Sequence, residues 1–127
     1  MRPVLINGDL WVIHKVSPAS PLLIDRTGSP KIAVADGAAK EIHISETVAP
    51  PLLDAVVLHE IAHAITMSYG LLPYLRQGIP EDTWVRMEEN TVGMMEQFGI
   101  EALALASVAL GRSVCINGLC ASVDKHI

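Results

Sequence analysis

The stretch LLDAVVLHEIAHAITMSYG, from Leu52 to Gly70, places two histidines and a glutamate inside a segment that is otherwise nearly all apolar. His59 and His63 are four residues apart, and Glu60 directly follows the first histidine. Two prolines precede the stretch and a glycine ends it, which predicts one helix from about Pro51 to Tyr69. This helix decides the fold, because its apolar surface has to be buried against other elements.

The same helix predicts a metal site. Residues four apart lie on one helix face a turn from each other, so His59 and His63 can bind one ion. Glu60 is turned aside from that ion, which suits a base acting on water better than a ligand. Burying these groups among apolar side chains is costly unless something compensates them, and a metal ion does so. We therefore predict Zn²⁺ as cofactor, His59 and His63 as ligands, and Glu60 as catalytic base.

A third ligand is required, because catalytic zinc takes three protein ligands and leaves a fourth position to water. The motif does not continue as H-E-x-x-H-x-x-G-x-x-H, which excludes a metzincin. A second predicted helix, WVRMEENTVGMMEQFG, offers Glu88, Glu89 and Glu96. Periodicity leaves Glu88 and Glu89 as alternatives at the flanks of the inward face, and it predicts Glu96 to be a solvated helix charge.

The remaining segments predict a small sheet and further helices. GDLWVIHKV, LLIDRTGSP, KIAVADG and KEIHISE indicate three or four strands before the first helix. LLPYLRQGIP indicates a connecting loop. The next helix is predicted from Pro80 to Phe98, with Gly99 as the residue that terminates it. A third, apolar helix is predicted over Ile100–Leu110, and SVCINGLCASV is predicted to form a C-terminal hairpin.

Composition restricts the class of protein. The 127 residues predict one domain, and 50% hydrophobic with 18% charged residues excludes a disordered chain. A net charge of -5 without a Lys/Arg cluster argues against nucleic-acid and anionic-membrane partners. No apolar segment resembles a signal peptide, and the longest apolar helix expected, Ile100–Leu110, is too short to span a bilayer. We expect a soluble, cytoplasmic protein with a peptide or protein substrate, and its oligomeric state is left open.

The two cysteines flank the turn of the predicted hairpin. Asn117-Gly118 favours a two-residue type I′ turn, whose register places Cys115 opposite Cys120. A cross-strand disulfide is therefore geometrically possible. In a reducing cytosol we expect two thiols instead.

These motifs resemble the small gluzincin-type zinc metallopeptidases of the ImmA/IrrE kind, particularly their compact phage-encoded relatives. The His-Glu-x-x-His of LLDAVVLHEIAHAI is the specific part, and GDLWVIHKV, KEIHIS and MEENTVGMMEQF add a weaker pattern. The resemblance implies one minimal zincin-like metallopeptidase domain over residues 1–127. Its expected fold is α+β: an antiparallel or mixed sheet of three or four strands packed on a zincin-type helix pair, plus the third apolar helix and the hairpin.

The resemblance also implies a ligand set. In relatives, the glutamate of the second helix commonly stands three residues before a small or branched apolar residue, which selects Glu89 ahead of Val92 and keeps Glu88 as the alternative. Two features depart from the family: Val92-Gly93 replaces the frequent Ala-Asn, and the third helix with the hairpin has no counterpart. Fuller relatives are proteases acting on transcriptional repressors, often with an attached DNA-binding domain.

The expected function is zinc-dependent hydrolysis of peptide bonds by a metal-activated water, with Glu60 as general base. We expect KEIHIS to be an exposed sheet edge that holds an extended peptide by strand addition. Candidate oxyanion donors are Tyr69, Tyr74 and His43, and His14 and His126 are expected at the surface. The alternative is a non-catalytic, zinc-stabilised protein-binding module, such as an inhibitor or adaptor. A fourth zinc ligand from Cys115 or Cys120 would support this alternative.

Overall fold

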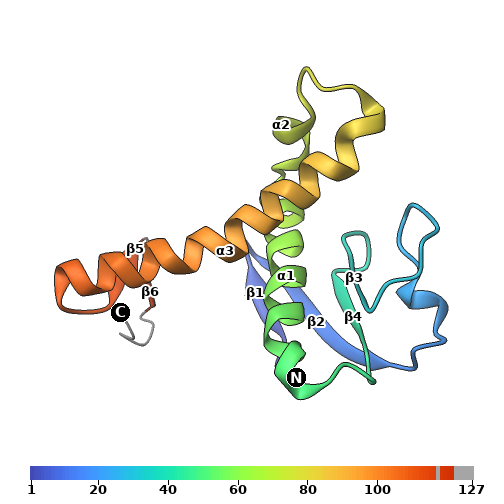
Figure 1. The fold of residues 1–127 in the computed structure, drawn as a ribbon, viewed down its shortest axis with the longest axis horizontal. Coiled ribbons are helices and arrows are strands. Elements are labelled where there is room, and N and C mark those ends of the chain that lie inside the picture. Colours follow the sequence, from blue (N-terminus) through green and yellow to red (C-terminus); the bar gives the residue numbers. More distant parts are fainter. Residues whose placement is uncertain (117, 122–127) are drawn as a thin grey trace.

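A four-stranded mixed sheet packs against one long helix, and a second long helix crosses the first (Figure 1). The computed structural model describes residues 1–116 and 118–121. In chain order the elements are β1 (Val4–Ile6), β2 (Asp9–Val16), the 3₁₀ turn η1 (Pro21–Leu23), β3 (Ala33–Asp36), β4 (Glu41–Ser45), α1 (Pro50–Ser68), α2 (Leu72–Arg76), the 3₁₀ turn η2 (Glu81–Thr83), α3 (Trp84–Leu110), β5 (Val114–Ile116) and β6 (Leu119–Ala121). The predicted α+β class, with a mixed sheet, helices and a C-terminal hairpin, is confirmed.

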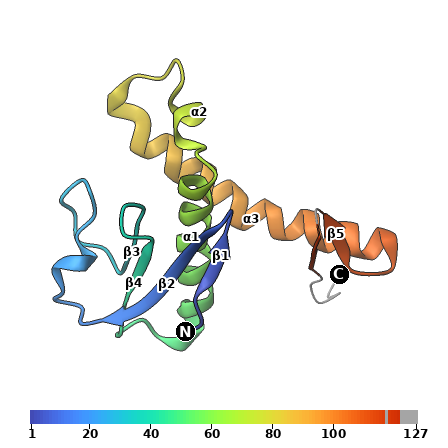
Figure 2. The same ribbon diagram turned by 180° about the vertical axis from the view of Figure 1, so that it is seen from behind.

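The core lies between the sheet and α1, and Figure 2 shows the sheet in front of this helix. Alternate residues of the strands point toward the helix, and Trp11, Ile42 and Ile44 are at most 1% exposed. The Trp11 indole donates a hydrogen bond to Ser68 Oγ over 2.7 Å, which ties β2 to the last turn of α1. The helix that carries the His-Glu-x-x-His motif is therefore fixed along its length.

The strand order is β1-β2-β4-β3, with β2 and β4 parallel and the other pairs antiparallel. The prediction that KEIHIS is an edge strand is wrong, because this segment forms β4, which pairs with β2 on one side and with β3 on the other. The free edge near α1 belongs to β3. The segment LLIDR is not a strand either, because Ser20 caps a 3₁₀ turn that starts at Pro21.

The predicted second and third helices form one continuous helix, α3, of 27 residues. Gly99 lies inside it, because a single glycine in a helix interior costs only about 1 kcal/mol. Gly111 ends the helix in the left-handed region with φ 68°, as predicted. The expected loop after α1 contains the short helix α2.

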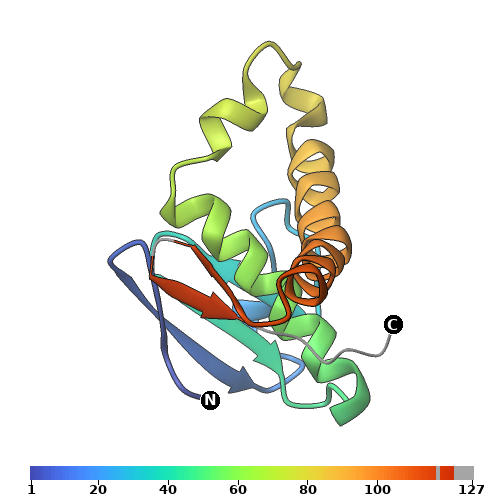
Figure 3. The same ribbon diagram turned by 90° about the vertical axis from the view of Figure 1, so that its left-hand side faces the viewer.

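The C-terminal half of α3 projects away from the sheet and carries the β5–β6 hairpin at its end (Figure 1, and end-on in Figure 3). Among the described residues, Glu81–Leu110 is the one helical segment long and apolar enough to cross a membrane, with mean hydropathy 1.2. The expected apolar helix, Ile100–Leu110, was judged too short to span a bilayer, but it is part of this longer helix. Core helices of soluble proteins meet the same criterion of length and hydropathy. In the projecting half, residues 97–110 are exposed or half-buried except Ser107, which is 1% exposed.

The hairpin pairs Cys115 with Cys120, as its predicted register requires. The two sulfurs are joined in a disulfide, so the expectation of two thiols is wrong. Asn117 of the predicted turn and His126 lie outside the described residues.

Truncating Ile44 tests the packing that holds α1 on the sheet. Ile44 is 0% exposed on β4. We expect Ile44→Ala to lower the free energy of unfolding by about 2–5 kcal/mol, because the lost side chain leaves a cavity. Leu10→Ala, at a position that is 57% exposed, is the matched control and should change it by less than about 0.5 kcal/mol. Urea denaturation measures both, and equal effects would contradict this core.

Candidate metal centre

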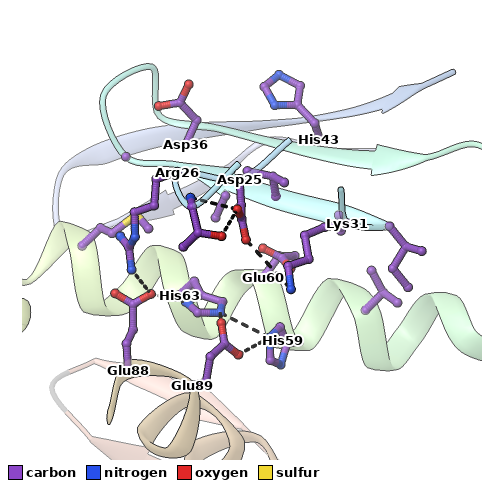
Figure 4. Close-up of a pocket in the computed structure, with 18 of the residues that line it drawn as sticks. Asp25, Arg26, Lys31, Asp36, His43, His59, Glu60, His63, Glu88 and Glu89 are labelled. Atoms are coloured by element: carbon purple, nitrogen blue, oxygen red, sulfur yellow. Dashed lines mark hydrogen bonds and ion pairs between the residues drawn. The ribbon is translucent and has the colours of Figure 1, made fainter. Parts of the chain in front are cut away.

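Three side chains from α1 and α3 converge on one point (Figure 4). The Nε2 atoms of His59 and His63 are 3.2 Å apart. The Glu89 carboxylate faces both, with Oε1 3.0 Å from His63 Nε2 and Oε2 3.3 Å from His59 Nε2. Helical spacing places the two histidines on one face of α1, and the crossing of α3 brings Glu89 opposite them. The predicted set His59, His63 and Glu89 is therefore brought together.

The other imidazole nitrogens contact two further carboxylates. His63 Nδ1 lies 3.1 Å from Glu88 Oε2, and His59 Nδ1 lies 3.1 Å from Glu96 Oε2. An ionised carboxylate can only accept a hydrogen bond, so each Nδ1 carries a proton and donates it. Each Nε2 is then left with a lone pair aimed at the common point. Carboxylates that orient metal-binding histidines in this way are common in metalloproteins.

Two imidazole nitrogens and a carboxylate thus face one another, an arrangement that either a bound cation or a proton on an imidazole would stabilise. Tetrahedral ligands at the Zn–N distance of 2.0–2.1 Å are about 3.3 Å apart, close to the separations seen here. The group His59, His63 and Glu89 could hold a metal ion, since its ligand atoms lie within 4.8 Å of one another. Two imidazoles and one carboxylate form a donor set that zinc accepts.

Glu88 is not a ligand in this arrangement. Its side chain is 5% exposed, and its Oε2 accepts hydrogen bonds from His63 and, over 2.7 Å, from Arg26 Nη2. Burial raises the pKa of Glu88, but the hydrogen bonds from His63 and Arg26 outweigh it and lower the pKa to about 2. Glu88 therefore stays ionised and orients His63. Arg26 comes from the loop between β2 and β3, and no sequence motif marked it.

Glu96 also departs from the prediction. It was expected to be a solvated helix charge, yet its carboxylate accepts a hydrogen bond from His59. Glu96 stands seven residues after Glu89, so two turns of α3 bring both to the same face. That spacing is a signal that the sequence did offer.

The charges of the cluster act on His63. Burial lowers the pKa of His63, but the hydrogen bond to Glu88 and the charges of Glu89 and Glu60 raise it more, and the net shift is upward. A proton on His63 thus partly compensates the carboxylates when no metal is bound. The carboxylates of Glu88, Glu89 and Glu60 therefore favour a positive charge at this site.

Glu60 lies on α1 beside the cluster and faces the sheet (Figure 4). It is 7% exposed. Burial raises the pKa of Glu60, while the charges of His63 and His59 and a backbone hydrogen bond from Ala35 on β3 act in the opposite direction. The net shift is upward, which moves this carboxylate toward the range of a base that works near neutral pH.

The cluster opens into a cleft of about 1080 Å³. Its walls are the β2–β3 loop, the free edge β3, the polar face of α1 and the first half of α3. Pockets that bind ligands usually measure about 300–1,000 Å³, so this cleft can accept a peptide segment. Its position puts an edge of β3 that no other described strand pairs with next to Glu60.

The predicted oxyanion donors are not supported by their positions. Tyr69 and Tyr74 are 51% and 75% exposed, and neither lines the cleft. His43 touches the cleft, but its side chain points away from α1 (Figure 4). Its ring stacks on His14 and its Nε2 lies 3.0 Å from Glu41. His14 is exposed, as predicted.

Replacing Glu88 tests its role as an orienting residue. We expect Glu88→Gln to retain the metal with an affinity lowered about 10–100-fold, the usual cost of losing a carboxylate that orients a ligand. Competition with a chromogenic chelator measures the affinity. Glu81→Gln, at an exposed position in η2, is the control and should bind as the unmodified chain does. Complete loss of metal in Glu88→Gln would make it a ligand.

Comparison with protein-family models, with curated proteins and with solved structures gave no significant match. The family resemblance therefore stays a prediction that rests on the motif. The functional argument has to come from the geometry of the site.

Proposed function

We propose that the protein is a zinc-dependent peptidase. One observation carries this proposal: the Nε2 atoms of His59 and His63 and the Glu89 carboxylate converge beside a buried glutamate that does not belong to this group. A purely structural zinc site has no use for Glu60 and normally fills four positions with protein ligands. The described residues supply three, which suits an open, catalytic position.

Zinc held by His59, His63 and Glu89 would act as a Lewis acid, which lowers the pKa of water and polarises a carbonyl. Glu60 would take the proton of the attacking water on its carboxylate and then pass it to the leaving amine nitrogen. Glu88 and Glu96 would keep the histidines in the tautomer that frees both Nε2 atoms. The raised pKa of Glu60 supports its role as a base that is also a competent acid.

The free edge of β3 supports an extended peptide as substrate. Antiparallel pairing with β4 occupies one side of β3 from Ala33 to Asp36, and its other side lines the cleft beside Glu60. A peptide added there would exchange backbone hydrogen bonds with β3, which gives affinity without requiring a particular sequence. This proposal replaces the predicted edge KEIHIS with the strand that precedes it.

No specific observation favours the alternative, a non-catalytic zinc-stabilised binding module. A fourth ligand from Cys115 or Cys120 would have supported it. Both sulfurs are instead joined to each other in the hairpin, and neither cysteine belongs to the His59–His63–Glu89 group.

Metal determination together with a peptide-hydrolysis assay tests the proposal. We expect close to one zinc per chain and cleavage of an unstructured protein such as casein, lost on chelation and restored by zinc. Because a metal that binds only the folded chain stabilises it, chelation should also lower the melting temperature. A chain purified without metal that binds no added zinc would refute the proposal. Zinc binding without any cleavage would favour the binding module.

A further inference from the structure

The projecting half of α3 presents an apolar stripe that nothing in the described residues covers. The stripe repeats at intervals of four, three, four and three residues, the spacing of a coiled-coil seam. Its members are Met94, Phe98, Glu101, Leu105 and Val108, and Arg112 follows at the next interval, just past the helix end. The four apolar members are 62%, 53%, 51% and 47% exposed, respectively.

The stripe faces away from the hairpin. Leu103 lines the small groove between α3 and the strands of the hairpin, and Ser107 is 1% exposed. Leu105 follows Leu103 by two residues and precedes Ser107 by two, which places it about 200° around the helix from each. The hairpin therefore leaves the seam free for another occupant.

The charges of Glu101, in the stripe, and of Arg112, just past the helix end, indicate that occupant. The midpoint between Leu105 and Val108 along the chain is also the midpoint between Glu101 and Arg112. If a second copy of α3 packs antiparallel about this midpoint, Leu105 lies against Val108 of the second copy. Glu101 then lies beside Arg112 of the second copy, and the same two contacts recur on the other side of the axis. A two-fold interface requires this kind of self-complementarity.

We propose that the protein forms an antiparallel homodimer through this seam of α3. A parallel pairing would set Glu101 against Glu101 and Arg112 against Arg112, which costs free energy. The antiparallel interface thus covers the exposed apolar side chains of the stripe on both copies.

A lipid bilayer is the competing occupant of the same apolar surface. A charged side chain at the middle of a membrane-spanning helix is expensive, and Glu101 lies inside the apolar stretch of α3. A second copy gives that carboxylate an arginine, which hydrocarbon does not. The observations therefore favour self-association, and the proposal is independent of the metal centre.

Charge reversal in the full-length chain tests the pairing by sedimentation. We expect the unmodified chain to dimerise, and Glu101→Arg and Arg112→Glu to weaken the dimer about tenfold or more, because each turns two attractive contacts into repulsive ones. The double variant Glu101→Arg with Arg112→Glu restores both contacts and should dimerise as the unmodified chain does. A parallel dimer keeps like charges opposite each other in every one of these variants, so a dimer that either single variant leaves unweakened overturns the proposal.

A substitution at the centre of the seam gives a second, larger effect. We expect Leu105→Lys to weaken the dimer about 100-fold, as removal of a central apolar contact does. Leu52→Lys, on α1 at a position 49% exposed, is the matched control and should leave dimerisation unchanged. Circular dichroism confirms that each variant is folded. A monomeric unmodified chain at all accessible concentrations would overturn the proposal.

Vesicle flotation separates the two occupants. We expect the unmodified chain not to float with phosphatidylcholine vesicles at concentrations where it dimerises. Flotation that Leu105→Lys abolishes would assign the seam to a membrane and overturn the dimer.

Discussion

Glu60→Gln is expected to abolish peptide hydrolysis while leaving the metal content unchanged. Glutamine has nearly the shape of glutamate but cannot accept the proton of the attacking water. General base catalysis contributes about 10²–10⁴-fold, so kcat should fall by at least that factor. Glu60 is not among the three converging ligand groups, which is why the metal should remain. Zinc determination and a fluorogenic peptide assay on the same preparation measure both quantities.

The control for this prediction is Glu46→Gln, at an exposed position just after β4. It makes the same chemical change away from the cluster, and its activity should equal that of the unmodified chain. If Glu60→Gln lost its zinc as well, Glu60 would be acting as a ligand. If it kept both zinc and activity, another group would have to serve as the base.

The second large effect is expected from Glu89→Gln, which should lose the metal. The substitution removes the negative charge that faces both Nε2 atoms at 3.0–3.3 Å and leaves two neutral imidazoles. We expect the stoichiometry to fall from close to one zinc per chain to well below one. His59→Ala should behave in the same way, because it leaves the ion with a single imidazole.

Glu88→Gln is the matched control for this experiment, since it alters the neighbouring glutamate of the same helix. The affinity loss in Glu89→Gln should exceed the roughly 10–100-fold expected for an orienting carboxylate. Retention of zinc in Glu89→Gln together with its loss in Glu88→Gln would exchange the roles of the two residues.

The ligand pair on α1 could be predicted because it depends on local geometry alone. One helix, two histidines at a spacing of four and an adjacent glutamate define their own relative positions. The choice between Glu88 and Glu89 could not be made in this way. Neighbouring helix positions differ by 100°, and both lay at the flanks of a broad apolar face. What distinguishes them is Arg26, which is 62 residues from Glu88 and binds it.

Strands β2, β3 and β4 were predicted, but β1 was missed, the strand predicted in LLIDR was wrong, and the strand order was not predicted. β4 directly precedes α1, which suggested an edge, yet it lies between β2 and β3 because the parallel pairing of β2 and β4 leaves β3 outside. Such pairing depends on contacts distant in sequence, which periodicity does not report. The short strand β1 had a local signal, since Asn7-Gly8 with φ 47° and 83° forms the tight turn that joins it to β2.

The ion pair between Arg26 and Glu88 couples two parts of the molecule thermodynamically. Through Glu88 and His63, the order of the β2–β3 loop and the occupancy of the metal centre become linked equilibria. Linkage is reciprocal: if the metal makes the loop more ordered, then any peptide that orders the loop raises the affinity for the metal by the same factor. Under the proposed function, a bound peptide that orders the loop would help the chain retain its metal ion, and the chain without peptide would lose the metal more readily.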